Sequence, residues 1–236
     1  MEETKVSKKE IERWLITFPA LLILPIIICI YYAAQSYISS LKNTIAEKEA
    51  EIEALKVEVE ALHKEMDKLQ EVVNEVEAAS SVIRIINPKA TEDEVRTLAV
   101  RQVGKSRKYR IPLDLVIYRD WAEADLRWLP ASRRGPCGEV STAQVWRPTF
   151  RQLRPYGDYL DVDEVYDAGT EYLAGCYRTA LKWLGETADK VQIYRLSLAF
   201  YNAGMGHQPE VALHKARAHV RRVEGIFAKA EKLGVA

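Results

Sequence analysis

The stretch that decides the fold is Ile111 to Leu126, IPLDLVIYRDWAEADL, in which one acid, Glu123, closes an otherwise apolar and aromatic helical face. Pro112 suits a first helical turn, because its missing N–H would have no intrahelical partner there, so the helix should start near Leu113. Steps of three and four residues place one stripe of side chains together: Leu115, Tyr118, Ala122 and Leu126. Glu123 runs alongside that stripe, which predicts that it lies at the edge of a core.

A carboxyl at the edge of a core has unusual proton chemistry. Desolvation by Trp121, Leu126 and Trp128 would raise the pKa of Glu123, because burial disfavours the charged form. A carboxylic acid that keeps its proton near neutral pH is the donor that a glycosidase needs. The alternative is a solvated residue on a helix surface, where most charged side chains lie. Glu123 is therefore the candidate catalytic residue.

Length and composition limit the possible classes. A chain of 236 residues allows one compact domain with accessory segments. Lys plus Arg and Asp plus Glu both number 34, so no net field draws the chain to nucleic acid, and no nucleic-acid partner is predicted. The four histidines show no ligand spacing with cysteine or acid, so neither a metal nor another cofactor is predicted. Cys29 lies in an apolar run, and whether Cys137 and Cys176 form a disulfide stays open.

Residues 14–34, WLITFPALLILPIIICIYYAA, are an uncharged run of 21 residues. As a helix with a rise of ~1.5 Å per residue, the run is ~31 Å long, which matches a bilayer's hydrocarbon core. A cleaved signal peptide is the alternative, but its apolar region is shorter and does not continue into a polar helix. Lys and Arg residues precede the run, and the next positive charge is Lys42. The positive-inside rule therefore predicts a cytoplasmic tail at residues 1–13, one pass through the inner (cytoplasmic) membrane, and an extracytoplasmic C-terminal domain.

A seven-residue apolar repeat predicts a coiled coil over residues 36–80. Its a positions are Ile38, Ile45, Ile52, Val59, Met66 and Val73, and its d positions are Leu41, Leu55, Leu62, Leu69 and Val76, with Lys48 as the exception. β-branched residues at a with Leu at d favour a parallel two-stranded coil. Glu51 and Glu58 at g would face Lys56 and His63 at e of the partner. We therefore predict a parallel homodimer on a rod of ~60 Å, with a trimer as the alternative.

Residues 88–236 are predicted to form a mostly helical globular domain, beginning at Pro88. Thr91 with Glu94 forms a capping box that opens a helix ending around Gly104. Residues 128–145 are rich in Gly and Pro and are predicted as a loop, with a short strand pair possible at residues 139–146. Further helices are predicted at residues 162–184, 190–203 and 213–233. Trp121 and Trp183 are expected in the core.

Four short stretches carry a resemblance, in this order along the chain. Tyr109 and Pro112 precede Glu123, and GEVSTAQ contains Gly138 and Gln144. Two helical motifs follow: Ala168, Gly169, Tyr172 and Leu173, and then Leu198, Ala199, Phe200, Tyr201, Asn202, Ala203 and Gly204. Their types, order and spacing resemble the soluble lytic transglycosylase (SLT) domain family, which has a lysozyme-like, mainly α fold. The resemblance covers residues 95–220, roughly half of the chain.

The resemblance implies cleavage of the β-1,4 bond between N-acetylmuramic acid and N-acetylglucosamine in peptidoglycan, leaving a 1,6-anhydro end. Glu123 would protonate the leaving oxygen and then deprotonate the muramyl 6-hydroxyl, so no second carboxylate is needed. The expected substrate-binding residues are Gln144, Tyr172, Tyr201, Asn202, Trp128 and Trp146. For the aromatic residues the alternative is core packing, and for Asn202 it is capping of a helix end.

The motifs also depart from the family pattern. Ala124 replaces the Ser that follows the catalytic Glu, and Ser141, Thr142 and Ala143 replace Gly-Leu-Met. These changes leave open a non-catalytic peptidoglycan-binding tether of an envelope assembly. A lysozyme-type hydrolase is the third reading, with Glu139 or Asp125 as a possible second carboxylate that activates water.

Overall fold

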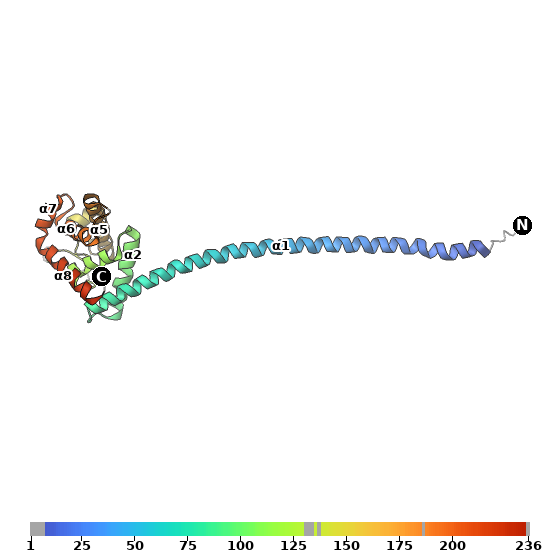
Figure 1. The fold of residues 1–236 in the computed structure, drawn as a ribbon, viewed down its shortest axis with the longest axis horizontal. Coiled ribbons are helices and arrows are strands. Elements are labelled where there is room, and N and C mark those ends of the chain that lie inside the picture. The colour runs from blue at the N-terminus through green and yellow to red at the C-terminus, as the bar shows by residue number, and fades with distance from the viewer. Residues whose placement is uncertain (1–7, 130–134, 136–137, 186, 235–236) are drawn as a thin grey trace. The chain divides into compact units, whose positions relative to one another are not determined.

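The computed structural model describes residues 8–129, 135, 138–185 and 187–234, with the backbone alone for residues 10–22. These residues form eight α-helices and no strand, which confirms the mainly α prediction (Figure 1). The chain divides into two units, one up to Asp67 and one from Lys68 onward.

The first unit is formed by the helix α1 (Lys8–Ile86) as far as Asp67, and the helix continues without interruption through Pro25. From Ile23 onward α1 includes an 18-residue window with a mean hydropathy of 1.4, none of it buried. The helix is therefore long and apolar enough to cross a membrane. Residues 1–7 of the predicted cytoplasmic tail and the side chain of Trp14 lie outside the described part.

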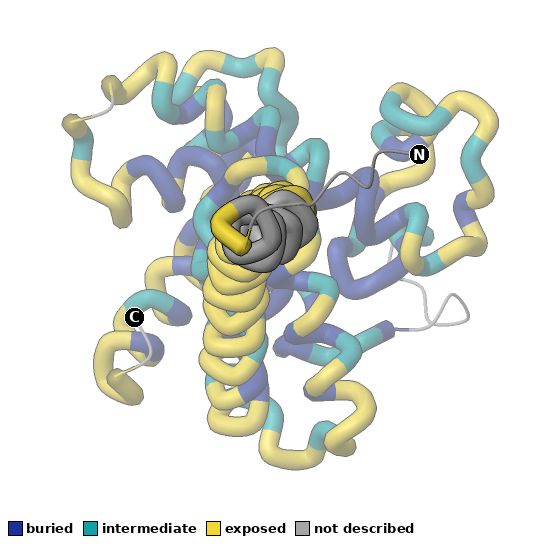
Figure 2. Tube along the Cα trace, turned by 90° about the vertical axis from the view of Figure 1, so that its right-hand side faces the viewer, coloured by how far each residue is buried: buried dark blue, intermediate teal, exposed yellow. Residues whose placement is uncertain are grey.

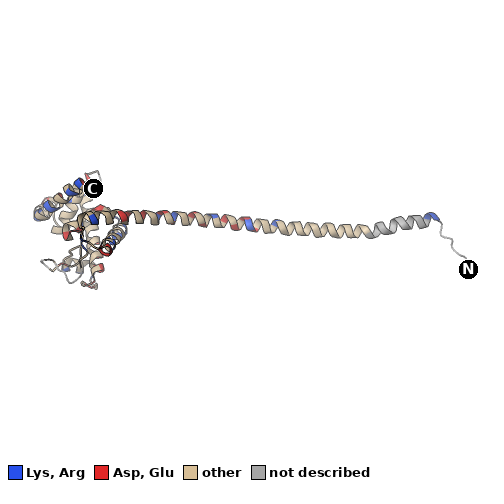
Figure 3. Ribbon diagram, turned by 90° about the horizontal axis from the view of Figure 1, so that it is seen from below, with Lys and Arg blue, Asp and Glu red and all other residues tan. Residues whose placement is uncertain are grey.

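The predicted coiled-coil positions of α1 are exposed to solvent. From Ile38 to Val73 the exposed fractions of the apolar positions run from 44% at Leu41 to 66% at Leu69, and Figure 2 shows this part of α1 in the colour of exposed residues. Charged side chains of both signs follow one another along the same segment (Figure 3). Within the chain Lys48 pairs with Glu51, and Lys56 pairs with Glu53 at 3.1 Å. A single copy of the chain thus leaves the predicted apolar seam uncovered from Ile38 to Val73.

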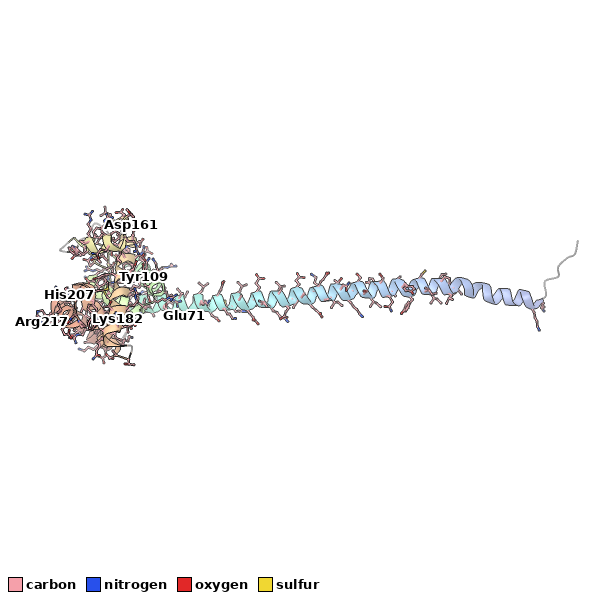
Figure 4. The ribbon with its side chains drawn as sticks, turned by 90° about the horizontal axis from the view of Figure 1, so that it is seen from above. Glu71, Tyr109, Asp161, Lys182, His207 and Arg217 are labelled. Carbon is pink, nitrogen blue, oxygen red and sulfur yellow. The ribbon has the colours of Figure 1, made fainter. Side chains whose placement is uncertain are left out.

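The last turns of α1 belong to the second unit, which begins earlier than the predicted start at residue 88. Ala79 and Ile83 are each only 1% exposed and lie in the core. Val76, predicted at a d position of the coil, packs against this core. Arg107 pairs with Glu75 at 2.7 Å and with Glu71 at 3.3 Å, a residue labelled in Figure 4. The predicted coil seam therefore ends near Val73, because the apolar residues that follow face the core of the second unit.

The second unit continues with seven further helices: α2 (Glu92–Tyr109), α3 (Leu113–Ala124), α4 (Arg147–Leu153), α5 (Val162–Leu184), α6 (Lys190–Ala203), α7 (Pro209–Lys215) and α8 (Arg217–Leu233). The start of α3 and the bounds of α5 and α6 agree with the predictions, as does the Thr91 and Glu94 capping box. α2 was predicted to end around Gly104 but runs to Tyr109, where Arg110 takes a left-handed conformation. The predicted strand pair is a single bridge between Val140 and Val145, and α4 was not predicted.

The core of the second unit surrounds α3, which contacts both α2 and α8. Leu115 and Val116 are 0% exposed, and Trp121 is 5% exposed, as expected. Trp183 is 55% exposed, so its predicted core position was wrong. Cys176 is buried, whereas Cys137 lies outside the described residues. The segment at residues 111–126 thus contains the central helix of this unit.

Candidate active site

A cleft of about 510 Å³ opens at the C-terminal end of α3. Seven of the predicted site residues line it: Glu123, Glu139, Gln144, Trp146, Tyr172, Tyr201 and Asn202. Val145, Thr149, Ala203, Gly204 and Arg222 complete the lining. Six parts of the chain therefore meet around the Glu123 carboxyl: α3, the 138–146 loop, α4, α5, α6 and α8. The volume is within the range of sites that hold small ligands.

Glu123 lies in the last turn of α3 with its side chain 16% exposed. Among the described residues, no group donates a hydrogen bond to its carboxyl. Burial raises the pKa of Glu123 to about 7, although the positive charges of Arg119 and Arg222 act in the opposite direction. The negative charges of Asp120 and Glu139 raise it further. The carboxyl therefore keeps its proton to a higher pH than an ordinary glutamate does, which suits a proton donor near neutral pH.

A buried polar cluster lies one turn before Glu123 on the same helix. Arg119 and Asp120 are both 0% exposed, and Arg119 Nε donates to Asp120 Oδ1 at 2.6 Å. Gln102 on α2 donates to Asp120 Oδ2 at 2.9 Å, and the Tyr166 hydroxyl on α5 donates to the same oxygen at 2.7 Å. Arg119 Nη2 also donates to the Thr170 hydroxyl at 3.3 Å. These bonds tie α3 to α2 and α5 and so fix the helix that presents the acid.

The loop across the cleft is held by its own polar groups. The Thr142 hydroxyl donates to the Arg127 carbonyl at 2.8 Å and accepts from the Leu129 N–H at 3.1 Å. Gln144 Nε2 donates to the Ser141 carbonyl at 2.7 Å. Ser141 and Gln144 have φ angles of 66° and 48°, in the left-handed region. The loop is thus a fixed wall next to the end of α3.

Gly169 allows α5 to approach that loop closely. A Cβ at Gly169 would lie 2.6 Å from Val145 Cγ2 and 2.7 Å from the Ala143 Cβ, so only glycine fits there. The Tyr201 hydroxyl donates to the Ala143 carbonyl at 2.7 Å, and its ring centroid lies 5.5 Å from that of Tyr172. Burial raises the pKa of Tyr172 to about 12 and also raises the pKa of Tyr201. Both phenols therefore remain protonated donors at neutral pH.

Two predicted residues lie outside the cleft lining. The Trp128 ring is covered by the Arg101 guanidinium, whose Cζ is 4.3 Å from the ring centroid, and it contacts Tyr166 edge to face at 5.6 Å. The stacking surface expected at Trp128 is therefore already occupied. Asp125 accepts hydrogen bonds from Arg222 at 2.9 Å and from Arg127 at 3.4 Å. Asp125 is thus held in ion pairs rather than placed in the cleft, and Glu139 is the possible second carboxylate that lies there.

The structure adds His219 and Arg222, two residues that the sequence analysis did not single out. Both lie on α8, and Arg222 lines the cleft. The His219 Nε2 atom lies 3.7 Å from Glu123 Oε1. The sequence signal that could have identified them is their three-residue spacing on α8, next to the buried Val220 and Val223. Within the described part of the chain, no three His, Cys, Asp or Glu residues form a group that could hold a metal ion.

No family model, no curated protein and no solved structure matches this chain. The chemistry of the cleft is therefore inferred from its own geometry, together with the motif resemblance described above.

Proposed function

We propose that the chain is a membrane-anchored peptidoglycan lytic transglycosylase whose second unit is a lysozyme-like SLT domain. One observation carries the proposal: Glu123, a carboxyl whose pKa burial raises to about 7, lies in a cleft lined by residues from all four motif stretches. That arrangement supports acid/base chemistry by one group on a polar polymer. The motif resemblance supplies the identity of the polymer.

In the proposed reaction Glu123 first donates a proton and then accepts another. The protonated carboxyl gives its proton to the glycosidic oxygen that leaves the muramyl C1, and the C1–O bond breaks. The resulting carboxylate takes the proton of the muramyl 6-hydroxyl as that oxygen bonds to C1 and closes the 1,6-anhydro ring. Glu123 is protonated again at the end, so neither water nor a second carboxylate is consumed. A pKa of about 7 suits a group that must both give and take a proton.

The other lining residues have roles that fit a glycan strand. Trp146 is 56% exposed, which leaves its indole available for stacking on a pyranose ring. Asn202 is exposed in the lining and offers amide donors and acceptors to sugar hydroxyl or acetamido groups. The Gln144 side-chain amide donates one hydrogen bond to its own loop, through Nε2. Tyr201 holds the loop through Ala143, so we assign it to shaping the cleft.

Hydrolysis is the second candidate function, because Glu139 places another carboxyl in the cleft. The ends of the released glycans distinguish the possibilities. Purified sacculi digested with the full chain in detergent micelles should release muropeptides with 1,6-anhydro ends, measured by mass spectrometry. Reducing ends would favour the hydrolase, and binding without release would favour the non-catalytic tether.

We propose that the uncovered seam of α1 is occupied by a second copy of the chain, in parallel. Leu62 on the seam is 58% exposed, and Val57, outside the seam, is 63% exposed. Light scattering of the full chain in micelles should therefore show a dimer that Leu62→Gln weakens and that the matched control Val57→Gln leaves unchanged. A wild-type monomer would contradict the proposal, and a trimer would contradict the two-stranded state.

We further propose that α1 crosses the inner (cytoplasmic) membrane once, with the second unit outside the cytoplasm, where peptidoglycan is found. The basic residues before the apolar run support this orientation. A reporter that functions only outside the cytoplasm should be active when it is fused after Ala236. Activity of a reporter that functions only in the cytoplasm would show the opposite orientation.

A further inference from the structure

His219 on α8 is a buried histidine whose Nε2 has no hydrogen-bond partner among the described residues. Its side chain is only 10% exposed, and its Nε2 lies 3.7 Å from Glu123 Oε1. That distance is too long for a hydrogen bond. Buried polar atoms in folded proteins are almost always paired, so an unpaired one requires an explanation. The Glu123 carboxyl is the acceptor within reach.

The surroundings of His219 keep its ring neutral. Burial lowers the pKa of His219 to about 4, and the positive charge of Arg222 on the same helix acts in the same direction. The charged and titratable groups that act on Glu123 from the packed elements are Arg119 and Asp120 on α3, Tyr201 on α6, Arg222 on α8 and Glu139 on the loop. A neutral imidazole carries one N–H and can act as a hydrogen-bond donor without adding charge.

We propose that His219 is a positioning residue for Glu123, donating its Nε2 proton to Oε1 of the carboxylate that exists between the two halves of the reaction. This inference rests on the proposed function. A carboxylate in this poorly solvated place has no other donor among the described residues, so a donor that engages after proton transfer favours the charged state. The same bond orients the carboxylate for its second step, removal of the 6-hydroxyl proton. Interactions that strengthen as charge develops are those that accelerate a reaction.

A purely structural role explains the position less well. Val220, Val223 and Ile226 already form the buried apolar face of α8 and are 1% to 6% exposed. An aliphatic residue at 219 would extend that face without leaving an unpaired nitrogen in the interior. A histidine there costs desolvation that only a polar contact offsets.

The test is a ¹³C NMR titration of the glutamate carboxyls of the full chain in detergent micelles, which requires no catalytic activity. His219→Met and His219→Gln form the informative pair, because their side chains are similar in length and only glutamine can donate. We expect Met to raise the pKa of Glu123 by about one unit, the size of a tenfold change in the protonation equilibrium, and Gln to keep it near the wild-type value. Val223→Ala, which alters the packing of α8 without touching a polar group, should leave it unchanged.

An unchanged or lowered pKa of Glu123 in His219→Met would overturn the assignment. Equal shifts in the Met and Gln variants, or an equal shift in Val223→Ala, would do the same. In glycan cleavage, His219→Met should lower kcat by about ten- to a hundredfold with little change in KM, the size expected for a hydrogen bond to a charged group. His219→Gln should recover part of that loss. If the wild type cleaves no glycan, the proposed function fails, while the titration still decides the role of His219.

Discussion

Asp120 and Glu123 are two carboxyls on the same helix, three residues apart, in opposite surroundings. Asp120 is fully buried and accepts hydrogen bonds from Gln102, Tyr166 and Arg119. Glu123 is mostly buried, accepts none from the described residues, and its pKa is raised by burial to about 7. A paired buried charge holds elements together, whereas an unpaired one keeps its proton for chemistry. We therefore expect Asp120 to contribute to stability, and we propose Glu123 for catalysis.

The largest effect on activity should come from Glu123→Gln. The amide keeps the size of the side chain and removes its proton chemistry, so we expect cleavage of sacculi to fall by roughly 10²- to 10⁴-fold. Release of soluble muropeptides measures the rate, and circular dichroism checks that the variant is folded. Full activity in a folded variant would place the acid elsewhere, with Glu139 as the next candidate.

The largest effect on stability should come from Asp120→Asn. This change leaves the Arg119 guanidinium buried without its counter-charge and turns an amide N–H₂ toward groups that now donate to Asp120. We expect the free energy of unfolding to fall by about 3 to 5 kcal/mol, the usual result of breaking a buried ion pair. Denaturant unfolding of the second unit measures it. A stability equal to that of the wild type would mean that the cluster does not anchor α3.

The pH dependence of stability should separate the two carboxyls further. The pKa of Glu123 is about 7 when folded and about 4.3 when unfolded, so the folded state binds more protons between these values. Wild-type stability should therefore fall as pH rises from about 4 to 7, whereas Glu123→Gln lacks this pH-dependent loss of stability. Above pH 7 we expect the variant to be more stable by about 3 kcal/mol, and near pH 4 the two should be equal. An equal difference at both pH values would show that the pKa of Glu123 is not raised.

The smallest effect should come from Glu139→Gln. The proposed reaction needs one carboxyl, so the rate should change by less than about tenfold, well below the effect of an essential acid or base. Removing a nearby negative charge should also lower the pKa of Glu123, moving the alkaline limit of activity to lower pH. Digestion of sacculi across a pH series gives both results. Complete loss of activity would support the hydrolase reading.

The sequence predicted the parts of this structure that depend on local chemistry. The start of α3, the capping box before α2 and the bounds of α5 and α6 follow from caps and from helical periodicity. The burial of Glu123 was also readable, because an acid beside an apolar stripe on a central helix has little access to water.

Other features depend on contacts between distant segments and could not be read from local patterns. The heptad repeat continues to Val76, but the burial of Ala79 and Ile83 in the core of the second unit ends the predicted coil seam earlier. Trp128 is predicted to stack on a sugar ring, and nothing nearby in the sequence indicates that Arg101 covers it. His219 lies 96 positions after Glu123, and only the packing of α8 on α3 brings the two together.

The central claim is that Glu123 acts from its protonated form, and the pH dependence of cleavage tests it most directly. The initial rate of muropeptide release by the full chain, measured at substrate concentrations below KM, reports the pKa values of the free protein. We expect the rate to fall as pH rises through about 7, the pKa that burial gives to Glu123. A rate that stays constant or increases through pH 7 would contradict the account.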